Sequence, residues 1–155
     1  MRLFRTSRVV FTVVLWSLAF GGCRQTDSQV NEQLNRQARL AAGASVRLQD
    51  VTSFPWDSVR IAGPYDAPRT ASDSSTKVWQ AISKTGLASR DDIDVLVFLR
   101  EGQVVAVVEH PRRLGDFDST AVRRTYTRSE AVFASRMNPA DSTTTLSYPE
   151  RKLMP

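Results

Sequence analysis

The hydrophobic positions of this chain recur with two different periods, one typical of helices and one typical of strands. In residues 30–42, Val30, Leu34 and Ala38 fall at helical spacing, and Gly43 follows as a stop. The sequence therefore predicts a short helix with a thin apolar stripe over residues 30–42.

A second helix is predicted over residues 73–85. Trp79 and Ile82, with Val78, form its expected buried face. Gly86 is expected to adopt a left-handed C-cap, after which Leu87 folds back onto the helix. The candidate N-caps are Asp73, Ser74 and Ser75.

The clearest predicted element is a central β-hairpin over residues 93–109. Two apolar runs, IDVLVFL and VVAVV, flank a two-residue turn at Glu101-Gly102. Such a turn sets Leu99 opposite Val104, and Val97 opposite Ala106. Because apolar residues occupy both faces of these strands, the hairpin is expected to lie in the core.

Further strands are predicted on both sides of the hairpin. Residues 45–51 form one, and Val59 and Ile61, alternating with polar neighbours, form a second that ends at Gly63-Pro64. After a loop over 112–119, weaker strands are expected at 121–128, 131–136 and, as an edge strand, 143–148; a helix over 119–125 is an alternative. The expected fold class is α+β: one antiparallel sheet of about four to six strands with two helices packed on one face.

The N-terminus carries an export signal. Arg2, Arg5 and Arg8 precede an apolar run from Val9 to Phe20, and small residues follow. A basic start, an apolar stretch and a small-residue exit are typical of a secretory signal peptide. We expect residues 1–22 to be the signal peptide, 23–29 a tether, 30–136 a single domain, and 137–155 a loosely ordered tail.

Gly21-Gly22-Cys23 resembles the lipobox of bacterial lipoproteins, in which the cysteine becomes the first mature residue and carries lipid. Phe20 departs from that pattern, which usually has a branched aliphatic residue there. Cys23 is the only cysteine, and an unpaired thiol is unusual in an oxidising compartment, so lipidation accounts for it.

Two alternatives to lipidation remain open. One is an uncleaved membrane anchor, although a spanning helix needs about 20 apolar residues and the run from Val9 is shorter. The other is a soluble exported form, since Ala19-Phe20-Gly21 also fits an ordinary signal-peptide exit.

The segment Phe54-Pro55-Trp56-Asp57 leads into a short strand and Pro64-Tyr65, a pattern that resembles small bacterial envelope lipoproteins. This resemblance implies a fold family and no activity. The residue after the cysteine is Arg24 and not aspartate. By resemblance to other such lipoproteins, this implies sorting to the outer membrane, where the protein would face the periplasm.

The net charge argues against nucleic acid as a partner. The chain carries 21 basic and 16 acidic residues, but three of the basic ones belong to the signal segment. The remaining 133 residues are therefore nearly balanced, whereas nucleic-acid binding requires a concentration of basic side chains.

His110 is the only histidine, and Asp116 and Asp118 follow it closely. Such a group could act as a base or bind a metal. However, Pro111 directly follows His110, and a metal site needs three or four ligands, so we expect a strand-end residue with no metal and no cofactor.

Trp56 and Asp57 could form an aromatic platform with a carboxylate, as in carbohydrate recognition. The alternative is that Trp56 fills the core and Asp57 caps a turn, which is favoured because one carboxylate cannot provide the pair needed for glycoside hydrolysis.

The remaining candidates for a partner surface are Tyr65, Arg112 and Arg113, and the arginines would form a basic patch if residues 123–128 lie beside them. We therefore expect a non-catalytic, lipid-anchored binding module with an envelope protein or a glycan as partner. The alternative is a periplasmic hydrolase or glycan-binding domain that uses Asp57 with Trp56, or His110.

Overall fold

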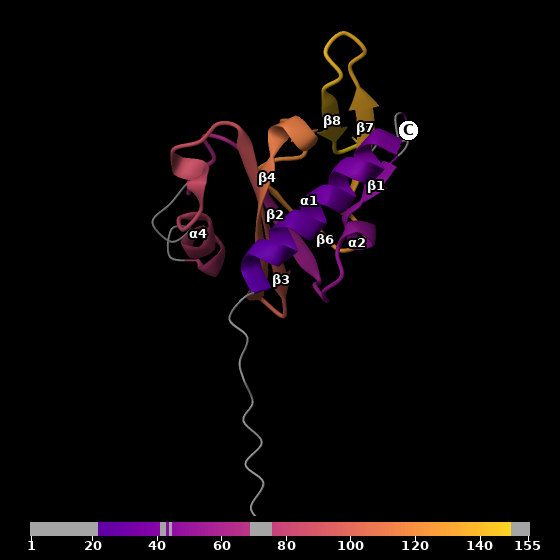
Figure 1. Cartoon of the computed structure of the whole chain (residues 1–155). Coiled ribbons are helices and arrows are strands. Elements are labelled where there is room, and N and C mark those ends of the chain that lie inside the picture. Colours follow the sequence, from indigo (N-terminus) through magenta and orange to yellow (C-terminus); the bar gives the residue numbers. More distant parts are fainter. Residues whose placement is uncertain (1–21, 41–42, 44, 69–75, 150–155) are drawn as a thin grey trace, which may run out of the picture.

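The computed structural model describes residues 22–40, 43, 45–68 and 76–149, with only the backbone of residues 22–25. It confirms an α+β fold (Figure 1). The strands form two four-stranded sheets and not the expected single sheet. Residues 1–21 and 150–155, and with them nearly all of the predicted signal peptide, lie outside the described residues.

The larger sheet contains β2 (Ser58–Ala62), β3 (Ile93–Arg100), β4 (Gln103–Pro111) and β6 (Arg124–Thr127) in the antiparallel order β4-β3-β2-β6. The predicted hairpin is confirmed as β3 and β4, and Leu99 does pair with Val104. The predicted pairing of Val97 with Ala106 is wrong, because the register shifts by one residue at a β-bulge. Val105 is the extra residue, so Val97 pairs with Val107.

The smaller sheet contains β1 (Ser45–Arg47), β5 (Asp116–Phe117), β7 (Val132–Met137) and β8 (Thr144–Ser147) in the order β1-β7-β8-β5. The β5–β8 pair is parallel, and the other two pairs are antiparallel. The expected edge strand at 143–148 is therefore β8, an inner strand, and the segment expected to be a loosely ordered tail contributes β8 and the turn before it to the sheet.

The long helix α1 (Gly22–Leu40) begins well before residue 30, so the predicted tether at residues 24–29 is helical. Gly43 adopts φ +92° shortly after the helix ends, consistent with its predicted role as a stop. Residues predicted as the end of the first strand instead form the one-turn helix α2 (Leu48–Val51), which buries Leu48 and Val51.

The second predicted helix is shorter than expected. It comprises α4 (Lys77–Ile82), followed by the 3₁₀ turn η1 (Gly86–Ala88). Thr76 is the N-cap and accepts a hydrogen bond from the Trp79 backbone N–H, whereas the expected caps at residues 73–75 lie outside the described residues. Gly86 is not left-handed, since it begins η1. A further 3₁₀ turn, η2 (Arg112–Leu114), lies in the expected loop.

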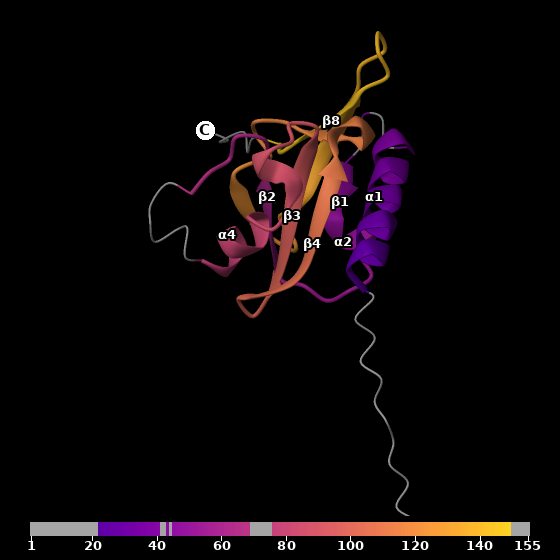
Figure 2. The same cartoon turned by 60° about the vertical axis from the view of Figure 1, so that its left-hand side comes forward.

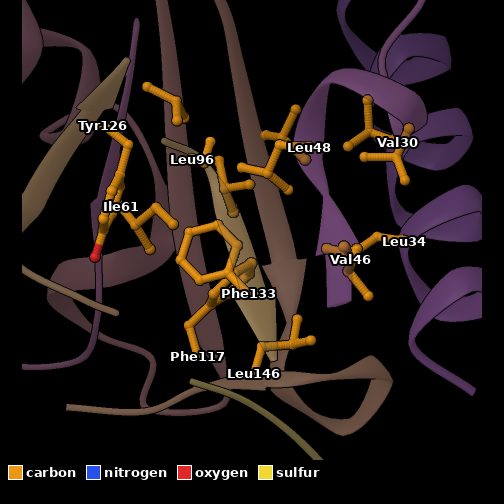
Figure 3. Packing of buried hydrophobic residues seen from close by; sticks show 14 of the residues in the cluster. Val30, Leu34, Val46, Leu48, Ile61, Leu96, Phe117, Tyr126, Phe133 and Leu146 are labelled. Atoms are coloured by element: carbon orange, nitrogen blue, oxygen red, sulfur yellow. The ribbon is translucent and has the colours of Figure 1, made fainter. Parts of the chain in front are cut away.

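Two hydrophobic clusters cover opposite faces of the larger sheet. The larger cluster joins β2 and β3 to α1 and the smaller sheet, and Phe133 packs edge-on against Phe117 and Tyr126 with ring centroids 5.1 and 5.2 Å apart (Figure 3). The smaller cluster joins Val95 and Val97 to α4 and η1. The helices thus lie on opposite faces of this sheet, not on one face as expected (Figure 2).

This arrangement follows from β3, whose side chains are buried on both faces from Ile93 to Phe98. A strand that is apolar on both faces needs a cover on each side.

Among the described residues, no helix is both long enough and apolar enough to cross a membrane.

Candidate functional site

Trp56 lies in the core and is only 3% exposed. Its ring packs edge-on against Phe98, its indole N–H donates to the Thr52 hydroxyl, and the Arg128 guanidinium lies 5.3 Å from its ring centroid. Each side of the ring is therefore occupied by a group of the protein itself. The prediction that Trp56 belongs to a surface for a partner is wrong.

Asp57 is exposed but serves the hairpin. One carboxylate oxygen accepts the backbone N–H of Glu101 at 2.5 Å, and the other accepts the Ser58 hydroxyl at 2.9 Å. The first of these bonds contributes most to lowering the pKa of Asp57. The main-chain N–H of Asp57 also donates to Leu99 O. Asp57 is thus a turn-holding residue, in agreement with the prediction that it caps a turn.

His110 is fully buried at the other end of the same hairpin, opposite Asp94. Its Nε2 lies 2.7 Å from Gly115 O, and its Nδ1 lies 2.7 Å from Asn31 Oδ1. Burial lowers the pKa of His110 to about 4. The hairpin therefore separates His110 from Asp57, and these two residues do not share a site.

Asp94 is a second buried titratable group on this sheet face, and sequence reasoning placed it only in an acidic run before the hairpin. One oxygen accepts the Phe117 backbone N–H at 3.2 Å, while no protein group donates to Oδ1. Burial, the largest cause, raises the pKa of Asp94 to about 7. Asp116 and Arg112 also act on this carboxyl through their charges. Within the described residues, no three His, Cys, Asp or Glu side chains gather as metal ligands.

The expected basic patch does not form as a free surface. Arg112 makes a two-pronged ion pair with Asp116 at 2.6 and 2.9 Å and also donates to Asp91 O. Arg124 lies over the Tyr148 ring, and Arg128 lies over Trp56. Arg113 is exposed on η2. Arg112, Arg124 and Arg128 are thus engaged at separate places.

Of the predicted partner residues, Asp57, Tyr65 and Arg113 are exposed, and Tyr65 is the aromatic one among them. It is 85% exposed, and its φ of +63° is unusual for a residue with a side chain. It lies in the segment after β2 and borders a cavity of about 760 Å³ between that segment and α4 with η1. The lining includes Pro64, Tyr65, Trp79, Ile82, Leu87 and Arg90.

One wall of this cavity is a stack of charged and aromatic groups. The Arg60 guanidinium, reaching from β2, lies 5.7 Å from the Trp79 ring centroid. Arg60 also donates to Asp66 Oδ2 at 3.0 Å and to Arg123 O at 2.8 Å. Asp66 is thereby neutralised beside the cavity, and Trp79 is held in place by its cationic neighbour.

Arg90, another charged residue of the lining, is also paired within the protein. It binds both carboxylate oxygens of Asp92, at 2.8 and 2.7 Å, and lies 3.5 Å from Glu109. The main-chain N–H of Gly86 donates to Glu109 at 2.9 Å, which fixes η1 on the sheet. The cavity therefore offers aromatic and aliphatic surface beside three charged residues, of which Asp66 and Arg90 already have partners and Asp91 is exposed.

Sequence reasoning included Tyr65 but assigned Trp79 to the buried face of its helix. In α4 Ile82 is buried, and Val78 and Trp79 are half-buried and pack against the smaller cluster, as predicted. The sequence does not show that the accessible part of Trp79 borders a cavity, because the segment around Tyr65 is brought there by the fold.

No protein-family model matches this sequence, and neither a curated protein nor a solved structure was found to be similar to it.

Proposed function

We propose that this chain is a lipid-anchored, non-catalytic binding domain of the bacterial cell envelope. In this proposal Cys23 carries the lipid, the domain faces the periplasm from the outer membrane, and a partner binds at the cavity bordered by Tyr65 and Trp79. The support for the anchor is the basic start, the apolar run and Gly21-Gly22-Cys23.

The observation that carries the binding proposal is the cavity itself. A concave, mostly apolar site of several hundred Å³ with a few polar groups is the usual form of a binding site. The exposed Tyr65 ring beside it provides a rigid aromatic contact of the kind enriched at interfaces.

A protein partner fits this cavity better than a glycan. Two of the three charged side chains that line the cavity, Asp66 and Arg90, are held by Arg60 and by Asp92. They have few hydrogen bonds left for sugar hydroxyls, whereas the apolar lining suits a hydrophobic side chain. We therefore propose an envelope protein that inserts an apolar side chain beside Trp79.

The anchor is tested by the intact mass of the membrane-fraction protein, compared with a Cys23→Ala variant. We expect a wild-type chain that begins at Cys23 with added acyl mass, and a variant that is uncleaved or soluble. A soluble wild-type chain with a free thiol, or one that keeps residues 1–22, would contradict the anchor.

The cavity is tested in cells with a photo-crosslinking amino acid at position 65. We expect a defined adduct with an envelope protein, lost when Ala88→Trp fills the cavity. Ala140→Trp is the matched control, because Ala140 is also exposed but lies on the distant β7–β8 hairpin. An adduct that survives Ala88→Trp would rule out the cavity as the binding site.

A further inference from the structure

The distance between the proposed anchor and the folded domain is fixed by α1. Cys23 lies in the first turn of this helix, which continues without a break to Leu40. The buried Val30 is seven positions after Cys23, a rise of about 10 Å in a helix. An extended tether of the same length would span up to roughly 25 Å. A helical connection therefore holds the domain close to the lipid.

The helix is also fixed in direction, because it is bonded to both sheets. The Asn31 amide donates to Glu109 O of β4 at 2.9 Å, and the Ser135 hydroxyl of β7 donates to Ala38 O at 2.7 Å. Val30, Leu34 and Ala38 are buried in the larger cluster. With contacts along its length, α1 cannot swing relative to the domain, so the start of the helix marks one particular end of the molecule.

That end carries three further segments, and we call its exposed residues the anchor-end surface. Figures 1 and 2 show that the β3–β4 turn and the link from α2 to β2 reach the same end as the start of α1. Lys77 at the start of α4 also lies there, since its Nζ donates to Gln103 Oε1. The anchor-end surface comprises Ser53, Pro55, Asp57, Lys77, Arg100, Glu101, Gly102 and Gln103.

We infer that the anchor-end surface lies against the lipid bilayer and that the β7–β8 hairpin points away from it. This inference rests on the proposed lipidation of Cys23. The hairpin extends from the opposite end of the molecule in both views (Figures 1 and 2). The surface carries balanced charge, since Arg100 and Lys77 lie beside Glu101 and Asp57, so the orientation rests on the place where α1 begins and not on charge.

The test uses the acylated full-length protein in vesicles of phosphatidylethanolamine and phosphatidylglycerol. Because lipidation consumes the only native thiol, one introduced cysteine can be labelled alone with a fluorophore. Ser53→Cys and Gln103→Cys place the label on the anchor-end surface, and Ala140→Cys, the matched control, places it on the far hairpin; all three positions are exposed. Quenching by lipids spin-labelled at the headgroup reports proximity to the bilayer.

We expect several-fold stronger quenching at positions 53 and 103 than at position 140. Equal quenching at all three positions, or stronger quenching at 140, in a preparation whose mass shows an acylated Cys23 overturns the orientation alone. A mass that shows an unmodified Cys23 overturns the anchor, and the orientation with it. The two failures are therefore distinguished by one mass measurement on the same sample.

Discussion

At the scale of single residues, the buried ring of His110 has conflicting demands. Gly115 O can only accept, so Nε2 carries a proton. Asn31 donates its amide to Glu109 O and so presents its oxygen to Nδ1, which favours a doubly protonated ring. Burial lowers the pKa of His110 to about 4 and favours the neutral ring. Burial is the larger effect, because a fully buried charge loses its whole hydration shell.

Replacing Asn31→Asp should raise the pKa of His110, because a carboxylate facing Nδ1 stabilises the imidazolium. The measurement is the pH dependence of the imidazole nitrogen chemical shifts. Asn35→Asp is the control, because Asn35 lies one turn along α1, where its side chain accepts from Arg39 and does not contact His110. An unchanged titration in Asn31→Asp would contradict the hydrogen bond to Nδ1.

Asp94→Asn should stabilise the protein at pH 8 and have little effect at pH 4. The pKa of Asp94 is about 7 in the folded state, against an ordinary value of 3.8. Between these values the unfolded chain releases a proton that the folded chain keeps, so wild-type stability falls as pH rises. This pKa difference corresponds to a loss of at most about 4 kcal/mol in the free energy of unfolding of the wild type above pH 7. The variant does not lose this stability, because its amide does not ionise.

Urea unfolding of both proteins at several pH values measures this difference. The effect of His110 runs the other way, since a lowered pKa costs stability as pH falls from 6.5 towards 4. It is present in both proteins and cancels in the comparison. A stability difference that does not grow with pH would show that Asp94 is ionised in the fold.

At the scale of elements, the β3–β4 turn combines favourable and unfavourable residues. Glu101 and Gly102 adopt φ values of +51° and +70°, the conformation of a type I′ turn. Glycine accepts a positive φ readily, but glutamate does not, and Asp57 compensates by binding the Glu101 N–H.

Glu101→Asn should therefore raise the free energy of unfolding by about 0.5–1 kcal/mol, because asparagine tolerates a left-handed backbone. Gly102→Ala should lower it by about 1 kcal/mol through backbone strain alone, since nothing lies within 4 Å of an added Cβ. Chemical denaturation measures both changes. If Glu101→Asn instead lowered the free energy of unfolding, the Glu101 side chain would stabilise the turn by more than its left-handed backbone destabilises it.

The elements that the sequence predicts well are those with strong local signals. The hairpin over 93–109 was predictable from its two apolar runs and Gly102, and the strand at Val59 and Ile61 from alternation. The bulge at Val105 was not, because nothing local distinguishes it from its valine neighbours. The helical start of α1 was also missed, since its polar residues are ordered by contacts such as that of the Asp27 side chain with the backbone of Glu109.

At the scale of the whole molecule, the division into two sheets depends on long-range pairing. The chain passes from β6 in the larger sheet to β7 in the smaller one within five residues, and both strands have weak alternation. The cavity depends on the same kind of information, because Tyr65 and Trp79 meet only when α4 covers the sheet. Candidate residues on local turns, such as Asp57, were more predictable than this site.

The layer formed by α4 and η1 should open before the rest of the molecule unfolds. It is held by two buried side chains, Ile82 and Leu87, by the half-buried Val78 and Trp79, and by the hydrogen bond from Gly86 to Glu109. In contrast, β3 is buried on both faces and pairs with a strand on each side. Local opening costs least where few apolar contacts are lost.

Native-state hydrogen exchange tests this difference. The backbone N–H groups of Gln80 and Ser83, which donate to Thr76 O and Trp79 O, should exchange through local opening with little dependence on denaturant. Those of Leu96 and Phe98 should exchange only on global unfolding. Leu34→Ala, in the other cluster, is the discriminating variant: it should cost about 2–5 kcal/mol and weaken protection in β3 while leaving α4 nearly unchanged. Equal loss of protection in α4 and β3 would mean that both layers unfold as one unit, so that the cavity wall could not open separately to admit a partner.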